Sequence, residues 1–150
     1  MGSLHARILA LLTFLFALRV IGQALVEIFA VERLPASEAW ASGLISYPIL
    51  LAVQLVMLGA MLKIVVDVSR DRGWFARRRP AWSRFMIRFS VVYAATMALR
   101  YILTMIFFPD MRWLGGAIPI LFHFVLAAFV YTWGTFLDRR RIFACTEPAC

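Results

Sequence analysis

Charged and amide side chains recur at regular spacing within an apolar stretch near the start of the chain. Arg19, Gln23 and Glu27 follow one another at steps of four residues. On an α-helix, residues four apart are separated by about 40° around the axis, so these three share one face. Ionisable groups at the centre of a membrane helix cost about 2.5–3.5 kcal/mol each, and they normally face other helices or a cavity. The spacing therefore predicts a polar surface directed into the protein.

Three further apolar stretches also carry polar side chains on one face each. These side chains are Tyr47 and Gln54 in the second stretch, Tyr93, Thr96, Arg100 and Thr104 in the third, and His123 in the fourth. We expect the helices to turn these faces toward one another in the outer half of the bilayer. The predicted polar cluster then consists of Arg19, Gln23, Glu27, Tyr47, Gln54, Tyr93, Arg100 and His123.

The charges of the predicted polar cluster do not balance. Glu27 can form a bidentate pair with Arg100 or with Arg19, but not fully with both. An unpaired guanidinium group in hydrocarbon is costly, so a lipid phosphate, an anionic ligand, a water-filled cavity or a carboxylate of another subunit should meet it. Three interpretations stay open: a hydrogen-bonded network that fixes the helix register, a ligand site, and a contact between subunits.

A histidine in a membrane helix can bind haem or a metal, carry protons or donate a hydrogen bond to a quinone. His123 cannot join His5 in binding one haem, because His5 lies at the opposite side of the bilayer. A hydrogen bond between helices is the simpler interpretation. The only cysteines, Cys145 and Cys150, are too few for a zinc site, so no metal or cofactor is predicted.

The apolar stretches that position these side chains are long enough to cross a membrane. Of the 150 residues, 63% are hydrophobic and 16% are charged, against about 45–50% and about 25% in soluble domains. Four stretches reach the roughly 20 residues that a bilayer requires: Ile8–Ala30, Leu44–Val66, Phe85–Phe108 and Ala117–Leu137. The sequence therefore predicts one all-α domain, a polytopic membrane protein built as a four-helix transmembrane bundle.

Basic residues predict the orientation of these spans. Twelve of the 16 lie in or beside the two termini and the segment between the second and third spans, and two lie in the other loops. Cytoplasmic loops carry the excess of Lys and Arg, so we expect both termini in the cytoplasm. Because Lys63 is the only lysine, the composition is typical of a GC-rich bacterial genome. The expected location is therefore the bacterial inner membrane.

The segment between the second and third spans mixes aromatic and basic side chains. Its members are Trp74, Arg77, Arg78, Arg79 and Trp82. Tryptophan favours the membrane interface, and each basic residue near anionic headgroups contributes about 1 kcal/mol. We expect this segment to contact anionic lipids, and we expect no nucleic-acid binding.

Sequence motifs for catalysis are not recognisable in the chain. It contains no G-x-S-x-G, no H-E-x-x-H and no Gly-rich phosphate loop, so no catalytic residue is predicted. The favoured interpretation is a non-catalytic anchor, assembly or accessory subunit that binds another membrane subunit or forms a homodimer. The alternative is a binder or transporter of a small anionic or quinone-like molecule at the polar cluster. A membrane enzyme that uses His123 and Glu27 for proton transfer ranks last.

Overall fold

The computed structural model describes residues 2–29, 47–77, 79–107 and 117–144. These ranges form four helices, namely α1 (Gly2–Phe29), α3 (Tyr47–Ser69), α4 (Pro80–Phe107) and α5 (Ala117–Ala144). Each helix is long and apolar enough to cross a membrane. The all-α class and the prediction of four such helices are therefore confirmed.

The helices extend beyond the apolar stretches that predicted them. α4 begins at Pro80 rather than Phe85, and α5 continues past Leu137 to Ala144. A helix of 28 residues, such as α4, is about 42 Å long, close to the thickness of a bilayer with its headgroups. Apolar composition marks only the hydrocarbon layer, whereas backbone hydrogen bonding continues through the headgroup layer. The predicted span residues 30, 44–46 and 108 lie outside the described ranges.

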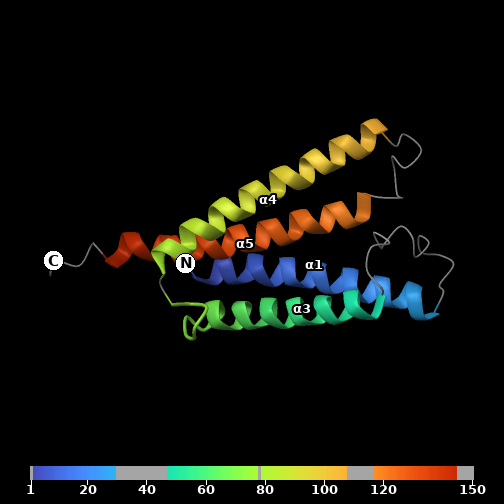
Figure 1. Cartoon of the computed structure of the whole chain (residues 1–150). Helices are drawn as coiled ribbons and strands as arrows, with labels where there is room; N and C mark the ends of the chain where they lie inside the picture. Colours follow the sequence, from blue (N-terminus) through green and yellow to red (C-terminus); the bar gives the residue numbers. More distant parts are fainter. Residues whose placement is uncertain (1, 30–46, 78, 108–116, 145–150) are drawn as a thin grey trace.

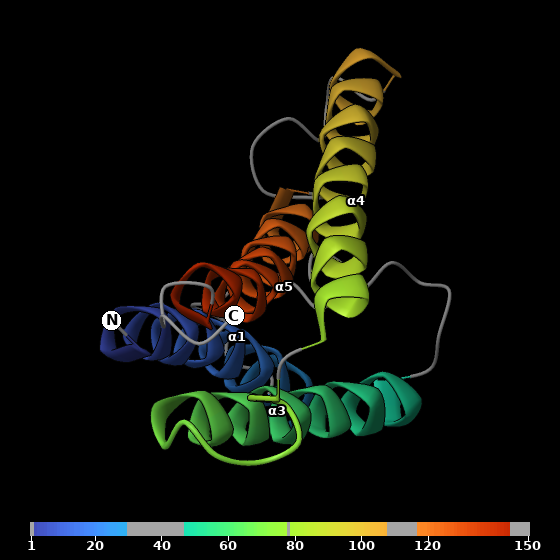
Figure 2. The ribbon, with the colours of Figure 1, turned by 90° about the vertical axis from the view of Figure 1, so that its left-hand side faces the viewer.

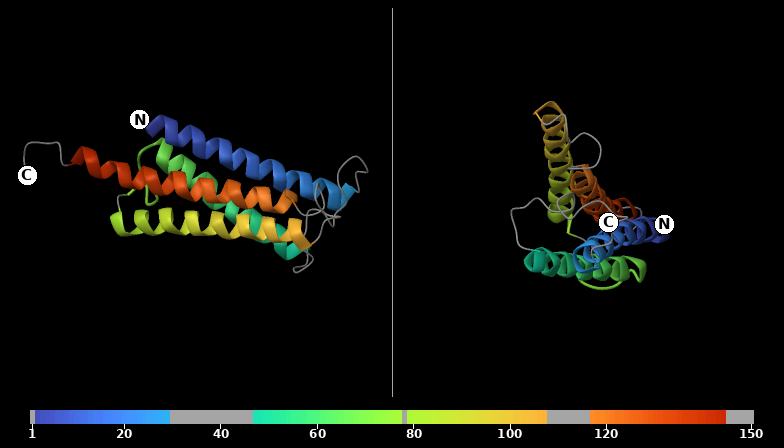
Figure 3. Two further views of the ribbon diagram at one scale, coloured as in Figure 1. Left: turned by 90° about the horizontal axis from the view of Figure 1, so that it is seen from above. Right: turned by 90° about the vertical axis from the view of Figure 1, so that its right-hand side faces the viewer.

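The four helices stand in an open row, in the order α3, α1, α5, α4. α1 packs against α3 and α5, and α4 packs against α5 alone among the described helices. Seen along the helices, the row is curved, and α4 lies apart from α1 and α3 (Figures 2 and 3). This differs from the expected bundle around one polar seam shared by all four helices.

Apolar packing is concentrated at one end of the row. This end, called the basic end below, holds the start of α1, the end of α5 and the loop 70–79 (Figure 1); the opposite end is called the far end. The core residues are Ala6, Leu9, Phe16, Val20, Met61, Ile64, Val68, Ala76, Phe129, Trp133, Phe136 and Leu137. Nine of these twelve lie in the halves of α1, α3 and α5 nearer the basic end or in the loop, and Phe16, Val20 and Phe129 lie just beyond the midpoints of α1 and α5. Helix packing is consequently weaker toward the far end.

The loop 70–79 is folded against the ends of α3 and α5. The buried carboxylate of Asp67 pairs with Lys63 Nζ and accepts a hydrogen bond from the Phe75 backbone N–H at 3.3 Å. The indole N–H of Trp133 on α5 donates to the Phe75 carbonyl at 3.1 Å. Gly73 passes so close to Asp67 that a Cβ would lie 2.4 Å from its carboxyl carbon. Asp67 and Trp133 thus fix the loop to both helices.

α4 and α5 approach each other most closely near the same end. The Ser83 hydroxyl donates to the Gly134 carbonyl at 2.9 Å, and both residues are buried. A Cβ on Gly134 would lie 2.9 Å from Cγ1 of Ile87. From this crossing α4 diverges from α5 toward the far end (Figure 1).

Gly134→Ala tests the close approach of α4 and α5. The added methyl group must displace Ile87, and such overpacking costs about 1–3 kcal/mol. Gly59→Ala is the matched control, because nothing lies within 4 Å of a Cβ there. We expect denaturant unfolding in micelles to show lower stability for Gly134→Ala only. Equal stability of the two variants would contradict the described crossing.

Candidate functional site

Two glutamines of the predicted polar cluster meet between α1 and α3. Gln54 Nε2 donates to Gln23 Oε1 at 3.0 Å, and each residue is only 3% exposed. The second polar atom of the Gln54 amide, Oε1, is buried without a hydrogen-bond partner. This contact joins α1 to α3 in a region where a lost polar partner is not replaced by water.

Arg19 lies one helical turn from Gln23 but contacts α5 instead of α3. Its guanidinium group lies 5.2 Å from the ring centroid of Phe122, within the range of a cation–π contact. Its Nε atom is buried and has no hydrogen-bond partner. Arg19 therefore retains an unused donor inside the protein.

A tyrosine and a histidine of the predicted polar cluster meet between α4 and α5. The Tyr93 hydroxyl lies 2.5 Å from His123 Nδ1, and the two rings are perpendicular with centroids 5.8 Å apart. With the ring proton on Nε2, the hydroxyl donates to Nδ1. A hydrogen bond between helices is what the sequence analysis expected for His123. Among the described residues, no group of three or more His, Cys, Asp or Glu side chains can hold a metal.

No carboxylate among the described residues pairs with the second arginine of the predicted polar cluster. Arg100 is exposed on α4, two turns from Tyr93. Arg100 and Arg19 both lie within electrostatic range of His123. The Lys63–Asp67 ion pair lies at the basic end, away from both arginines.

In the described part of the chain, Glu27 forms an ion pair with neither arginine. Glu27 is exposed near the far end of α1, within electrostatic range of Tyr47 at the start of α3. The Tyr47 hydroxyl is buried without a hydrogen-bond partner. The predicted polar cluster is thus distributed over three successive helix interfaces, because the row of helices does not close.

A stripe of large side chains runs along α4 and was not singled out by the sequence analysis. It follows the three- and four-residue steps of one helix face and is called the α4 stripe: Trp82, Phe85, Phe89, Tyr93, Thr96, Arg100, Leu103 and Phe107. Successive rings from Trp82 to Tyr93 have centroids 5.8–6.1 Å apart. Seven of its eight members are exposed, Phe107 to 70%. The signal was the repeated spacing of the aromatic residues.

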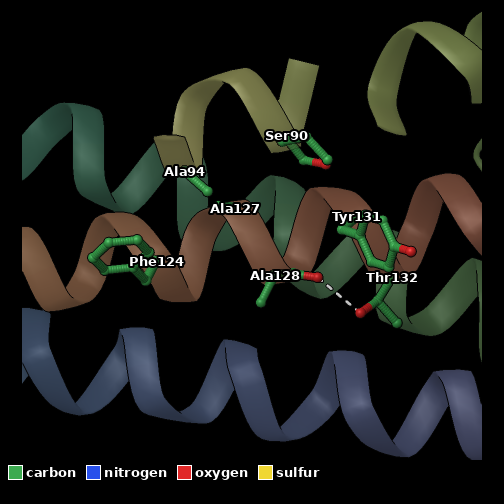
Figure 4. Close-up of a pocket in the computed structure, with 8 residues that line it drawn as sticks. Ser90, Ala94, Phe124, Ala127, Ala128, Tyr131 and Thr132 are labelled. Carbon is green, nitrogen blue, oxygen red and sulfur yellow. Dashed lines mark hydrogen bonds between the residues drawn. The ribbon is translucent and has the colours of Figure 1, made fainter. Parts of the chain in front are cut away.

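A shallow groove of about 290 Å³ lies between α4 and α5, away from the predicted polar cluster (Figure 4). Its lining residues are Ser90, Val91, Ala94, Phe124, Ala127, Ala128, Tyr131 and Thr132. The hydroxyl of Thr132 donates to the Ala128 carbonyl, and that of Ser90 donates to the Ile87 carbonyl. Since these hydroxyls are already bonded within their own helices, the groove offers mainly apolar surface.

The residues predicted to contact anionic lipids lie at the basic end. Trp74 and Trp82 are exposed, and Arg77 and Arg79 are exposed as well. The Arg79 guanidinium group lies 4.3 Å from the Trp74 ring centroid. Arg78 lies outside the described residues. The loop thus brings Arg79 and Trp74 together on its exposed surface.

No protein-family model matches this sequence, and comparison with curated proteins and with solved structures found no match either. Two features of the structure bear on function: Arg100, which pairs with no carboxylate among the described residues, and the exposed stripe that contains it.

A double-mutant cycle tests the glutamine pair. Gln54→Leu leaves Gln23 buried without its donor, and we expect a loss of about 1–2 kcal/mol because an unsatisfied polar group stays in a dry interface. Gln23→Leu should cost a similar amount. The double Leu variant should recover most of the loss, since it removes both polar groups. Unfolding in micelles measures all four proteins, and purely additive losses would argue against a coupled pair.

Gly73→Ala tests whether the loop is fixed by Asp67. Gly73 has a φ of 106°, a region that costs other residues about 1–3 kcal/mol, and its new Cβ would meet the Asp67 carboxylate. We expect the loop to be released and trypsin to cleave at its arginines about tenfold faster, which corresponds to about 1.4 kcal/mol. Gly59→Ala serves again as control. Unchanged cleavage would mean that the loop does not depend on this contact.

Proposed function

We propose that this protein is a non-catalytic anchor, assembly or accessory subunit of a membrane complex. The observation that supports this proposal is the α4 stripe. α4 contacts one neighbour among the described helices, and it exposes aromatic side chains and an arginine along one face. Aromatic residues and arginine are enriched in the central parts of protein interfaces. A helix with this face is suited to bind a second membrane protein.

The proposed location is the bacterial inner membrane, with the basic end in the cytoplasm. The concentration of arginine at that end supports this orientation through the positive-inside rule. The exposed Trp74 and Trp82, together with Arg77 and Arg79, would lie among anionic headgroups. The Asp67 contacts hold the loop in one shape, so it can act as a fixed anchor on the inner surface.

A second candidate function is the binding or transport of a small anionic or quinone-like molecule. It is favoured by the buried, unpartnered Nε of Arg19 and by the Tyr93–His123 pair nearby. A ligand with a carbonyl or anionic oxygen could accept hydrogen bonds from such donors. The first candidate is better supported, because the structure describes an exposed helix face that contains Arg100.

Native mass spectrometry of the protein, extracted gently from its own membrane, tests the proposal. We expect a species that carries a second polypeptide. Phe89→Ala removes a large side chain from the α4 stripe, and we expect at least about tenfold less complex, as for an interface hot spot.

The matched control is Val91→Ala, which truncates an equally exposed residue of α4 outside the stripe. A bare chain in both variants and in the natural protein would contradict the proposal. A small bound molecule instead of a polypeptide would favour the second candidate.

A further inference from the structure

The far half of α4 carries a groove that is suited to receive another helix; this groove is called the seat below. Thr96, Leu99, Arg100, Leu103, Thr104 and Phe107 line an open groove of about 300 Å³ that belongs to α4 alone. Their spacing of three and four residues is the pattern by which one helix packs against another. Among the described helices only α5 contacts α4, and no residue of α5 lines this groove.

Arg100 places a positive charge within this seat at hydrocarbon depth. Phe107, the last residue of α4, is about 10 Å further along the axis. The Cα–Cβ bond of a helical residue tilts toward the helix N-terminus, which for α4 is the basic end. The Arg100 side chain therefore leaves the backbone in the direction away from the headgroups at the far end. It remains within electrostatic range of His123. A lipid phosphate at the far end is consequently a poor partner for it.

The described part of the chain supplies no counter-charge for Arg100. Asp67 and Asp138 lie at the basic end, and Glu27 lies near the far end of α1. The Thr104 hydroxyl donates to the Arg100 carbonyl, and the Thr96 hydroxyl donates to the Val92 carbonyl. Among the described residues, the seat thus contains a guanidinium group without an acidic acceptor. A carboxylate matches its two parallel N–H donors best.

We infer that this seat binds a transmembrane helix of another membrane protein, and that an Asp or Glu on that helix pairs with Arg100. The inference rests on the proposed function and names the chemistry of the partner. A second copy of the chain fits less well. Its exposed Glu27 is two residues from the end of α1, about 3 Å from that end, whereas Arg100 is about 10 Å from the end of α4.

Photo-crosslinking in cells identifies the occupant of the seat. A benzophenone amino acid replaces Leu103 within the seat or, as the matched control, Ile102 on another face of α4. Both positions are exposed and at nearly the same depth. We expect a cross-link from position 103 to a membrane protein with an acidic residue in a transmembrane helix, and little cross-link from position 102.

Charge variants then test the ion pair. Arg100→Gln and Arg100→Glu should lower the cross-link at least about tenfold, whereas Arg88→Gln, at an exposed arginine of the same helix, should not. Exchanging the partner's acidic residue for Arg should restore the cross-link to Arg100→Glu. This rescue separates a lost ion pair from a misfolded chain.

Three other outcomes of the cross-linking experiment would overturn the inference. A cross-link that persists in both Arg100 variants means that a partner binds without this ion pair, and the proposed function stands. A cross-link to a second copy, or to lipid alone, excludes the acidic partner helix at this seat. In the lipid case, native mass spectrometry decides whether the proposed function also fails.

Discussion

The attachment of α4 to α5 at one end determines most of what the protein exposes. The absence of a side chain at Gly134 lets the two backbones approach, and Ser83 bonds to the Gly134 carbonyl at that point. Beyond it, the contact between Tyr93 and His123 joins the helices before they diverge. Because α5 is the one described neighbour of α4, most aromatic side chains of the α4 stripe and its arginine remain exposed, even beside the crossing. The candidate docking face thus depends on the position of α4 at the edge of the row as much as on the side chains it carries.

Each interface of the row carries one or two polar contacts within otherwise apolar surroundings. Gln23 meets Gln54 between α1 and α3, Arg19 meets Phe122 between α1 and α5, and Tyr93 meets His123 between α4 and α5. Lipid is as apolar as leucine, so apolar side chains alone give helices in a bilayer little preference for particular neighbours. A few hydrogen bonds can therefore select which faces pair. Arg100 is the exception, since no partner within the described chain meets it.

The sequence predicted the helices and their polar residues, but it could not predict the neighbours of these residues. Hydropathy is sufficient to locate spans because the bilayer requires about 20 apolar residues. Arg19 and Gln23 share a face by their spacing, yet they contact different helices, because α1 lies between α3 and α5. The α4 stripe was overlooked because its aromatic residues stand among other apolar residues. The role of Asp67 was hidden as well, since it depends on how the loop folds back.

α4 can act as a lever, because α5 alone among the described helices contacts it. Two contacts hold its first half, Ser83 with Gly134 and Tyr93 with His123. The arm beyond them, from Tyr93 to Phe107, is about 21 Å long, so a rotation of about 10° at Tyr93 displaces its tip by about 4 Å. The held half of α4 begins beside the loop that Asp67 and Trp133 fix in place, so the same helix combines a stationary base with a movable tip.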